Sequence, residues 1–279
     1  MKTIIIYALI LSSIALHSFN AAAQAHGHLN VGAIGTNQND KLFFANGGEF
    51  VDSSGYVKTL TFTNGGRFAG YHEGNITLTV LPATAEHSGP DPAAPAFGSF
   101  IQFSISCLSG PANGAFGFWD TGSTVPTDSV RPGERSTNLF RLTEADGSPD
   151  LDPYGHIHGR RFSATVPGIY TIAFQAFDTS TNGANGGPIH RPSDVFPMIF
   201  QAGINIASIT QTGLVASVRY GSTANQIFTL EYTTNLAQPI FWLPVAGPKI
   251  GNDYFQGLED PATVDAQRFY RIRADQYIP

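Results

Sequence analysis

Hydrophobic and polar residues alternate along much of this chain with the two-residue period of β-strands, most clearly in Phe100-Ile-Gln-Phe-Ser-Ile-Ser. Glycine-rich turns separate the alternating segments, and no long segment repeats hydrophobic residues at the spacing of a helix. The pattern therefore predicts an all-β protein built of antiparallel β-sandwich layers. The expected strands are residues 41–44, 56–63, 75–81, 98–108, 115–119, 138–142, 160–166, 169–177, 197–201, 214–220, 227–232, 241–245 and 268–272.

The pattern also predicts two units with a boundary near Ile204. Residues 26–203 are expected to form a large sandwich closed by an edge strand that ends at Gly203, and residues 204–279 a smaller β module. In the second unit, Phe-Thr-Leu-Glu-Tyr-Thr-Thr-Asn-Leu precedes Trp242, and Arg-Phe-Tyr-Arg-Ile-Arg follows it. These motifs resemble the small C-terminal modules of many secreted bacterial proteins. The resemblance implies a fibronectin-like sandwich used for display or attachment, with no chemistry of its own.

The first 25 residues have the features of a secretory signal peptide. Lys2 provides a positive charge, residues 4–16 form an apolar core too short to span a bilayer, and Ala23-Gln24-Ala25 fits a cleavage site. Cleavage after Ala25 makes His26 the first residue of the mature chain, whereas cleavage after Ala23 leaves Gln24 there. We therefore expect a secreted, periplasmic or cell-surface protein. Neither a transmembrane segment in the mature chain nor a hydrophobic C-terminal anchor is expected.

Composition narrows the function classes. The chain has 15 Lys and Arg against 21 Asp and Glu, a formal net charge of -6, and only 13% charged residues. Its basic residues do not cluster, which excludes the electrostatic pattern of a nucleic-acid binder. Cys107 is the single cysteine, so no internal disulfide forms and the hydrophobic core must hold the fold together. Because Cys107 follows an alternating strand, we expect a buried and unreactive thiol.

Two His-x-His triplets are the candidate metal ligands, His26-Gly-His28 and His156-Ile-His158. Residues two apart on a strand face the same side with Cα atoms about 7 Å apart, a span that two imidazoles can close around one ion. We expect His190, in a glycine-rich loop, to supply a third ligand, with His28 or His26 completing the set. Imidazole ligands indicate copper or zinc. The alternative is that the pair at 156 and 158 forms a polar strand face or braces a loop.

Further details of this site follow from its chemistry. Asp152 or Tyr154 is expected to orient the imidazoles through hydrogen bonds, as groups behind metal ligands commonly do. Ligating imidazoles must be neutral, so binding is expected to weaken below about pH 6. His72 and His87 are interpreted as loop residues.

The segment that begins at Gly155 also resembles a known family. Gly-His-Ile-His, the aromatic residue Phe162 and the later Pro-Gly-Ile-Tyr resemble the signature of bacterial surface-anchored repeats, the group that contains the choice-of-anchor M domain. Gly-His28-Leu-Asn30 is similar to the opening run of that group, with asparagine in place of its acid. The usual tryptophan before Pro-Gly is missing, and Arg160 and Phe162 stand there instead. The resemblance implies a secreted β-sandwich associated with metal handling, with a metal-uptake system or cell-surface component as partner and no catalytic activity.

Two other function classes fit parts of the sequence. A metal-free structural or adhesive surface protein needs no metal-binding histidines at all. A copper oxidase or monooxygenase would use the free amine and imidazole of His26 together with His28, as in the histidine brace of lytic polysaccharide monooxygenases. The sequence contains no Gly-x-Ser-x-Gly, His-Glu-x-x-His or phosphate-binding loop, so it offers no hydrolase site.

An acidic loop offers a second candidate site. Asp146, Asp150 and Asp152 place three carboxylates close together, as calcium ligands often are, but they lack the spacing of an EF-hand. A solvated turn rich in Asp, Ser, Gly and Pro accounts for the same residues.

Overall fold

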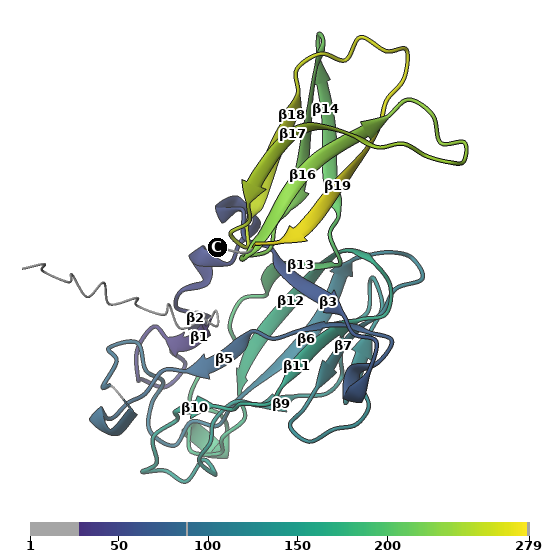
Figure 1. Ribbon diagram of the computed structural model, residues 1–279. Helices are drawn as coiled ribbons and strands as arrows, with labels where there is room; N and C mark the ends of the chain where they lie inside the picture. The colour runs from purple at the N-terminus through teal and green to yellow at the C-terminus, as the bar shows by residue number, and fades with distance from the viewer. Residues whose placement is uncertain (1–27, 88, 278–279) are drawn as a thin grey trace, which may run out of the picture.

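The computed structural model describes residues 28–87 and 89–277, and it confirms the all-β expectation (Figure 1). Helical residues in these ranges are confined to five short 3-10 helices, and none is long and apolar enough to cross a membrane. The 3-10 helices are η1 (Gly47–Glu49), η2 (Asp52–Ser54), η3 (Gly66–Phe68), η4 (Ala85–His87) and η5 (Ala184–Gly186). The strands of the first unit are β1 (His28–Ala33), β2 (Leu42–Phe44), β3 (Lys58–Phe62), β4 (His72–Gly74), β5 (Thr77–Val80), β6 (Ile101–Ser109), β7 (Phe116–Trp119), β8 (Asp128–Val130), β9 (Phe140–Arg141), β10 (Gly155–His156), β11 (Arg161–Ala164), β12 (Gly168–Asp178) and β13 (Phe196–Ala202).

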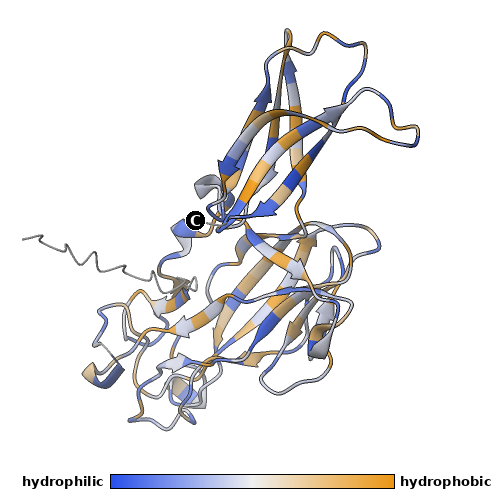
Figure 2. Ribbon diagram, viewed as in Figure 1, coloured by the Kyte–Doolittle hydropathy of each residue, from blue (hydrophilic) through white to orange (hydrophobic). Residues whose placement is uncertain are grey.

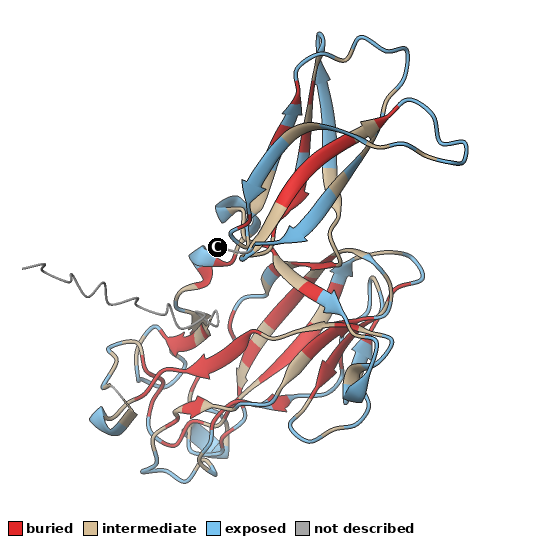
Figure 3. Cartoon of the chain, viewed as in Figure 1, coloured by how far each residue is buried: buried red, intermediate tan, exposed pale blue. Residues whose placement is uncertain are grey.

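The first unit contains two sheets. One has four strands in the order β10-β5-β1-β2, and the other has nine in the order β8-β7-β11-β4-β3-β13-β12-β6-β9. The two halves of the larger sheet face each other across an aromatic core. Phe103 on β6 contacts Phe118 on β7 with ring centroids 5.3 Å apart, and Phe162 on β11 contacts Phe174 on β12 at 5.6 Å. Figure 3 shows the buried residues along the strands that enclose this core.

Alternating side chains explain why these strands form. On β12, the apolar residues Tyr170, Ile172, Phe174 and Ala176 lie two positions apart and are all fully buried. Each large side chain buried in this way contributes about 1.5–3 kcal/mol relative to its exposed state. Apolar and polar positions succeed each other along the strands in Figure 2. Cys107 lies in the same core, and burial, with a contribution from Glu134, raises the pKa of its thiol to about 11.

Strand pairing departs from the expected antiparallel arrangement at two places. β1 pairs with β5 in parallel, and β13 pairs with β3 in parallel. β13 is also not an edge strand, because β12 pairs along its other side. The turn at Pro167 and Gly168 does not join paired strands, since β11 pairs with β4 and β7 whereas β12 pairs with β13 and β6. This turn instead carries the chain from one half of the larger sheet to the other.

The second unit has its own sheets and its own core. Its strands are β14 (Ile206–Thr212), β15 (Val215–Gly221), β16 (Gln226–Thr233), β17 (Leu243–Ile250), β18 (Phe255–Asp260) and β19 (Phe269–Gln276). They form two three-stranded sheets, β14-β15-β18 and β17-β16-β19, and within the described residues neither sheet includes a strand from before Gly203. The buried residues of this core are Val218, Tyr220, Phe228, Leu230 and Leu258.

Backbone hydrogen bonds connect the two units. The Phe255 N–H donates to the Gly55 carbonyl at 2.8 Å, and the Val57 N–H donates to the Asp253 carbonyl at 3.1 Å. The segment before β3 therefore lies directly against the start of β18, as Figure 1 shows.

Candidate metal centre

The candidate ligands lie on or near three neighbouring strands, β1, β5 and β10, and β5 lies between the other two. β1 pairs with β5 so that His28 lies opposite Thr77, and β10 pairs with β5 so that His156 lies opposite Thr79. Residues in register on paired strands face the same side of a sheet, and so do residues two apart on one strand. His28 and His156 therefore rise from one face of this sheet, on either side of the two threonines.

The opposite face of the same strands anchors the site to the core. Leu29, Val31 and Val80 are fully buried and Leu78 is 6% exposed. Alternation thus sends the apolar residues of β1 and β5 inward and His28 outward. A one-residue slip of β1 would exchange these faces, so burial of the leucines and valines fixes the position of His28.

The rings of three histidines form one contact cluster. The ring centroids of His28 and His156 are 4.6 Å apart with the planes at 70°, and those of His156 and His158 are 4.4 Å apart with the planes at 34°. His28 and His156 are half-buried, whereas His158 is exposed. β10 ends at His156, so His158 lies in the link to β11 and not on a continuing strand as expected.

Neighbouring polar groups hold these histidines in place. Nδ1 of His28 lies 3.2 Å from the Thr79 hydroxyl, and a hydrogen bond at one ring nitrogen orients an imidazole for a metal at the other. The Glu144 carboxylate accepts the backbone N–H of His156 at 2.6 Å. The Thr121 hydroxyl donates to the carbonyl of His158 at 2.7 Å, which anchors the link to β11.

The three rings lie close together but are not arranged as the ligands of one metal ion. Imidazole nitrogens bind zinc at about 2.0–2.1 Å, which places the ring centroids of neighbouring ligands about 5 Å apart. The rings of His28, His156 and His158 are slightly closer than this because they contact one another. Within the described ranges, no group of three or more His, Cys, Asp or Glu residues could hold a metal ion as it stands. The three imidazoles would therefore have to change position to bind one ion together.

His190 does not join this cluster, which corrects the expectation that it supplies the third ligand. Its Nδ1 lies 3.1 Å from the Asp40 carbonyl, and its Nε2 accepts the Ala96 N–H at 2.9 Å. The residue is 2% exposed, and its backbone N–H donates to the Asp178 carboxylate at 3.1 Å. Both ring nitrogens are used, so His190 braces the loops around it. His26 lies outside the described residues.

Asp152 and Tyr154 also have roles other than the expected one. Asp152 accepts the backbone N–H groups of Ala83, Thr84 and Tyr154 at 2.9–3.0 Å. Burial alone would raise the pKa of Asp152, but these hydrogen bonds and one from the Thr84 hydroxyl lower it. Tyr154 stacks on the His87 ring with centroids 4.1 Å apart. The Thr79 hydroxyl instead contacts the His28 imidazole, and Glu144 contacts the backbone N–H of His156.

The remaining candidates are explained by local structure. Asp146 accepts hydrogen bonds from the Ser148 hydroxyl and backbone N–H, which lower its pKa and form a tight turn. Asp152 also accepts hydrogen bonds from the protein. Two of the three carboxylates proposed as calcium ligands are therefore bound to protein donors. His72 is not a loop residue, because it lies buried in β4, where burial lowers the pKa of its imidazole.

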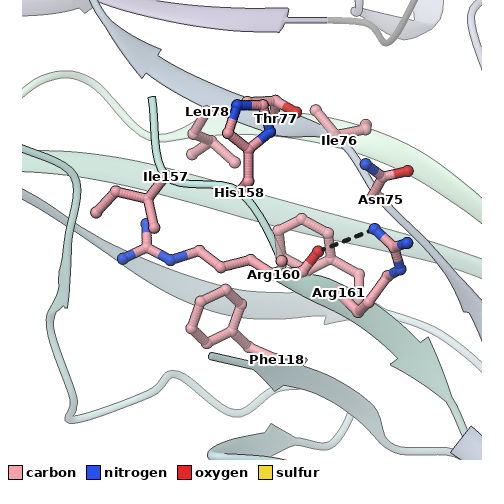
Figure 4. Close-up of a pocket in the computed structure, with 11 residues that line it drawn as sticks. Asn75, Ile76, Thr77, Leu78, Phe118, Ile157, His158, Arg160 and Arg161 are labelled. Carbon is pink, nitrogen blue, oxygen red and sulfur yellow. Dashed lines mark hydrogen bonds between the residues drawn. The ribbon is translucent and has the colours of Figure 1, made fainter. Parts of the chain in front are cut away.

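A pocket of about 290 Å³ opens beside His158 (Figure 4). One wall is the chain from Asn75 to Leu78, and the other is the link from Ile157 to Phe162, with Phe118 at its floor. This pocket cannot be predicted from the sequence, because its two walls come from segments that are distant along the chain.

Comparison with known protein families, curated proteins and solved structures found no match to this chain. The motif resemblances at Gly155 and after Phe228 therefore rest on those motifs alone. A function for this chain must therefore be inferred from the arrangement of the described residues.

Proposed function

We propose that this protein binds copper or zinc through His28, His156 and His158 and serves in metal capture or handling outside the cytoplasm. The observation that supports this proposal is the convergence of three imidazoles from β1 and the β10 region on one face of β5. Their exposure decreases from His158 inward, so an ion can enter from solvent and reach ligands on a rigid sheet. Imidazole nitrogens suit both metals.

The proposed partner and the proposed location outside the cytoplasm rest on the motif resemblances. A secreted protein with a solvent-accessible histidine site would deliver its ion to a metal-uptake system or hold it at the cell surface. The second unit is proposed to serve in display or attachment.

Metal titration tests the proposal directly. In protein purified without an affinity tag and dialysed against a chelator, we expect one copper or zinc ion per chain by calorimetry and metal analysis. The double variant His156→Ala and His158→Ala should bind at least about 100-fold more weakly, because losing a ligand costs more than the 10–100-fold typical of its outer partners. His87→Ala is the matched control, since this histidine stacks on Tyr154 outside the cluster. Unchanged affinity in the double variant would exclude these ligands.

The affinity should also fall on acidification. A metal competes with protons for each imidazole, whose ordinary pKa is about 6.5, so binding weakens as the pH falls through that value. Between pH 7.5 and 5.5 we expect the apparent affinity to decrease by more than tenfold, with proton release on binding measurable by calorimetry in buffers of different ionisation enthalpy. Binding that does not change across this range would point to carboxylate ligands instead.

A further inference from the structure

An asparagine followed by glycine can lose its side-chain amide by reaction with its own main chain. The nitrogen of the glycine attacks the side-chain carbonyl carbon of the asparagine and displaces ammonia. Because glycine has no Cβ, nothing on its Cα hinders this approach. The chain contains five such pairs, Asn46-Gly47, Asn64-Gly65, Asn113-Gly114, Asn182-Gly183 and Asn185-Gly186. All five share the same two reacting groups, so the fold decides how freely those groups can meet.

In two of the pairs, hydrogen bonds hold the asparagine side chain. Oδ1 of Asn46 accepts the Asn30 N–H at 2.9 Å, and Nδ2 of Asn46 donates to the His28 carbonyl at 2.7 Å. Nδ2 of Asn182 donates to two backbone carbonyls, at 2.8 and 2.7 Å. Each amide must break these bonds before it can turn toward its own glycine nitrogen.

In two further pairs, the glycine nitrogen is engaged. The Gly114 N–H donates to the Pro111 carbonyl at 2.8 Å, and the Gly186 N–H donates to the Gly183 carbonyl at 3.2 Å. A backbone nitrogen that donates a hydrogen bond must give up that bond and then lose its proton before it can attack. Four of the five pairs are therefore constrained in the folded protein.

Asn64-Gly65, in the loop between β3 and β4, differs from the other four pairs. Both residues are exposed. Within the part of the chain that the structure describes, no protein group forms a hydrogen bond with the Asn64 side chain or with the Gly65 N–H. A Cβ built on Gly65 would meet nothing within 4 Å. The amide and the attacking nitrogen can therefore approach each other without displacing a neighbouring group.

We propose that Asn64 is a site of spontaneous deamidation in the folded protein. The Gly65 nitrogen loses its proton and bonds to Cγ of Asn64, and the C–N bond of the side-chain amide breaks to release ammonia. Water then opens the resulting five-membered succinimide at either carbonyl, which leaves aspartate or isoaspartate at position 64. Water is the only co-reactant, and nothing is oxidised or reduced. The new carboxyl is ionised at neutral pH, so the net charge becomes one unit more negative.

The loop should keep its structure after this change, because contacts on both sides of the pair hold it. The Thr63 N–H donates to the Tyr71 carbonyl, and the Gly70 N–H donates to the Thr63 carbonyl, both at 2.9 Å. Arg67 donates to the Asp120 carbonyl at 2.9 Å. Deamidation therefore adds a negative charge to an intact first unit, and this inference does not depend on the metal site.

Peptide mass spectrometry of the full chain, incubated at 37 °C and pH 7.4, tests this inference. The folded protein should deamidate at Asn64 at least about fivefold faster than at any other asparagine–glycine pair, because each of the others must first break a hydrogen bond. In urea that unfolds the chain, these hydrogen bonds are lost and the difference between the pairs should disappear.

Two variants provide the controls. Asn64→Gln should prevent the appearance of the more acidic form in isoelectric focusing, and Gly65→Ala should slow it severalfold because a Cβ then stands beside the attacking nitrogen. Thermal unfolding of both variants checks that the fold is intact. Equal rates at Asn64 and the other four pairs in the folded protein, or an unreactive Asn64 under conditions in which the unfolded chain reacts, would overturn the proposal.

Discussion

Replacing Gly155 by alanine should destabilise the first unit by about 3 kcal/mol or more and abolish metal binding. A Cβ built on Gly155 would lie 1.7 Å from the carbonyl oxygen of Leu142 and 3.0 Å from the Cα of Thr143. Both contacts are with backbone, so no side chain can turn away to make room. The opposing segment cannot withdraw, because the N–H groups of Leu142 and Thr143 donate to Ile101, and the Ile101 N–H donates to the Thr143 hydroxyl at 2.8 Å.

The clash must therefore displace β10, which carries His156. Overpacking of a rigid interior costs typically 1–3 kcal/mol and occasionally more, and here the obstacle is main chain. For a protein of this size we expect the unfolding midpoint to fall by roughly 6–12 °C, measured by differential scanning calorimetry. Gly65→Ala is the matched control, since nothing lies within 4 Å of a Cβ there and its backbone is extended. A Gly155→Ala protein with an unchanged midpoint and zinc affinity would contradict this account of the site.

Asp260→Asn should destabilise the second unit by about 3–5 kcal/mol, the usual cost of removing one member of a buried ion pair. Asp260 is fully buried and pairs with Arg268, whose side chain is only 9% exposed. The Tyr270 hydroxyl at 2.9 Å and the Ala262 N–H at 3.2 Å also donate to this carboxylate. Asparagine would remove the charge that compensates Arg268. We expect faster amide hydrogen exchange in β18 and β19, with β12 in the first unit unaffected.

The matched control alters the other carboxylate bound by the same arginine. Asp265 contacts Arg268 at 2.6 Å but is 37% exposed, so Asp265→Asn should cost less than about 1 kcal/mol. Equal effects of the two variants would show that burial of the pair is unimportant.

The same ion pair sets a dependence on pH. Burial acts to raise the pKa of Asp260, but hydrogen bonds from Arg268, Ala262 and Tyr270 outweigh it and hold the pKa below its ordinary value of 3.8. A folded-state pKa below the unfolded one gives stability that is complete above about pH 4 and is lost as the pH falls through the folded value. Acid unfolding of Asp260→Asn should accordingly be less steep below pH 4.

Local sequence patterns are sufficient to predict the positions of most of the strands. The alternation from Ile169 to Phe177 predicted β12 almost to its ends, and the strand expected at residues 160–166 contains β11. Shorter or more polar strands were missed, among them β4 and β8, because three residues contain too little alternation to recognise. β1 was missed as well, although its Leu29 and Val31 are fully buried.

Local sequence patterns predict only part of the candidate site. The spacing of His156 and His158 predicted two adjacent rings, and the rings do contact each other. The prediction of His190 as third ligand is wrong, because its glycine-rich surroundings indicate a flexible loop whereas the residue is buried. Its burial depends on Asp40 and Ala96, which the chain brings to it from far away.

By itself, therefore, the sequence determined most of the strands and which of their faces turn inward, because burial of alternate side chains is a local property of an extended chain. Only the tertiary structure decided which strands lie side by side. The parallel pairing of β1 with β5 brings His28 to His156, and the packing of β10 against Leu142 and Thr143 requires glycine at position 155. His28 and His156 are distant along the chain, and strand registers that bring such residues together are selected by the packing of the whole core.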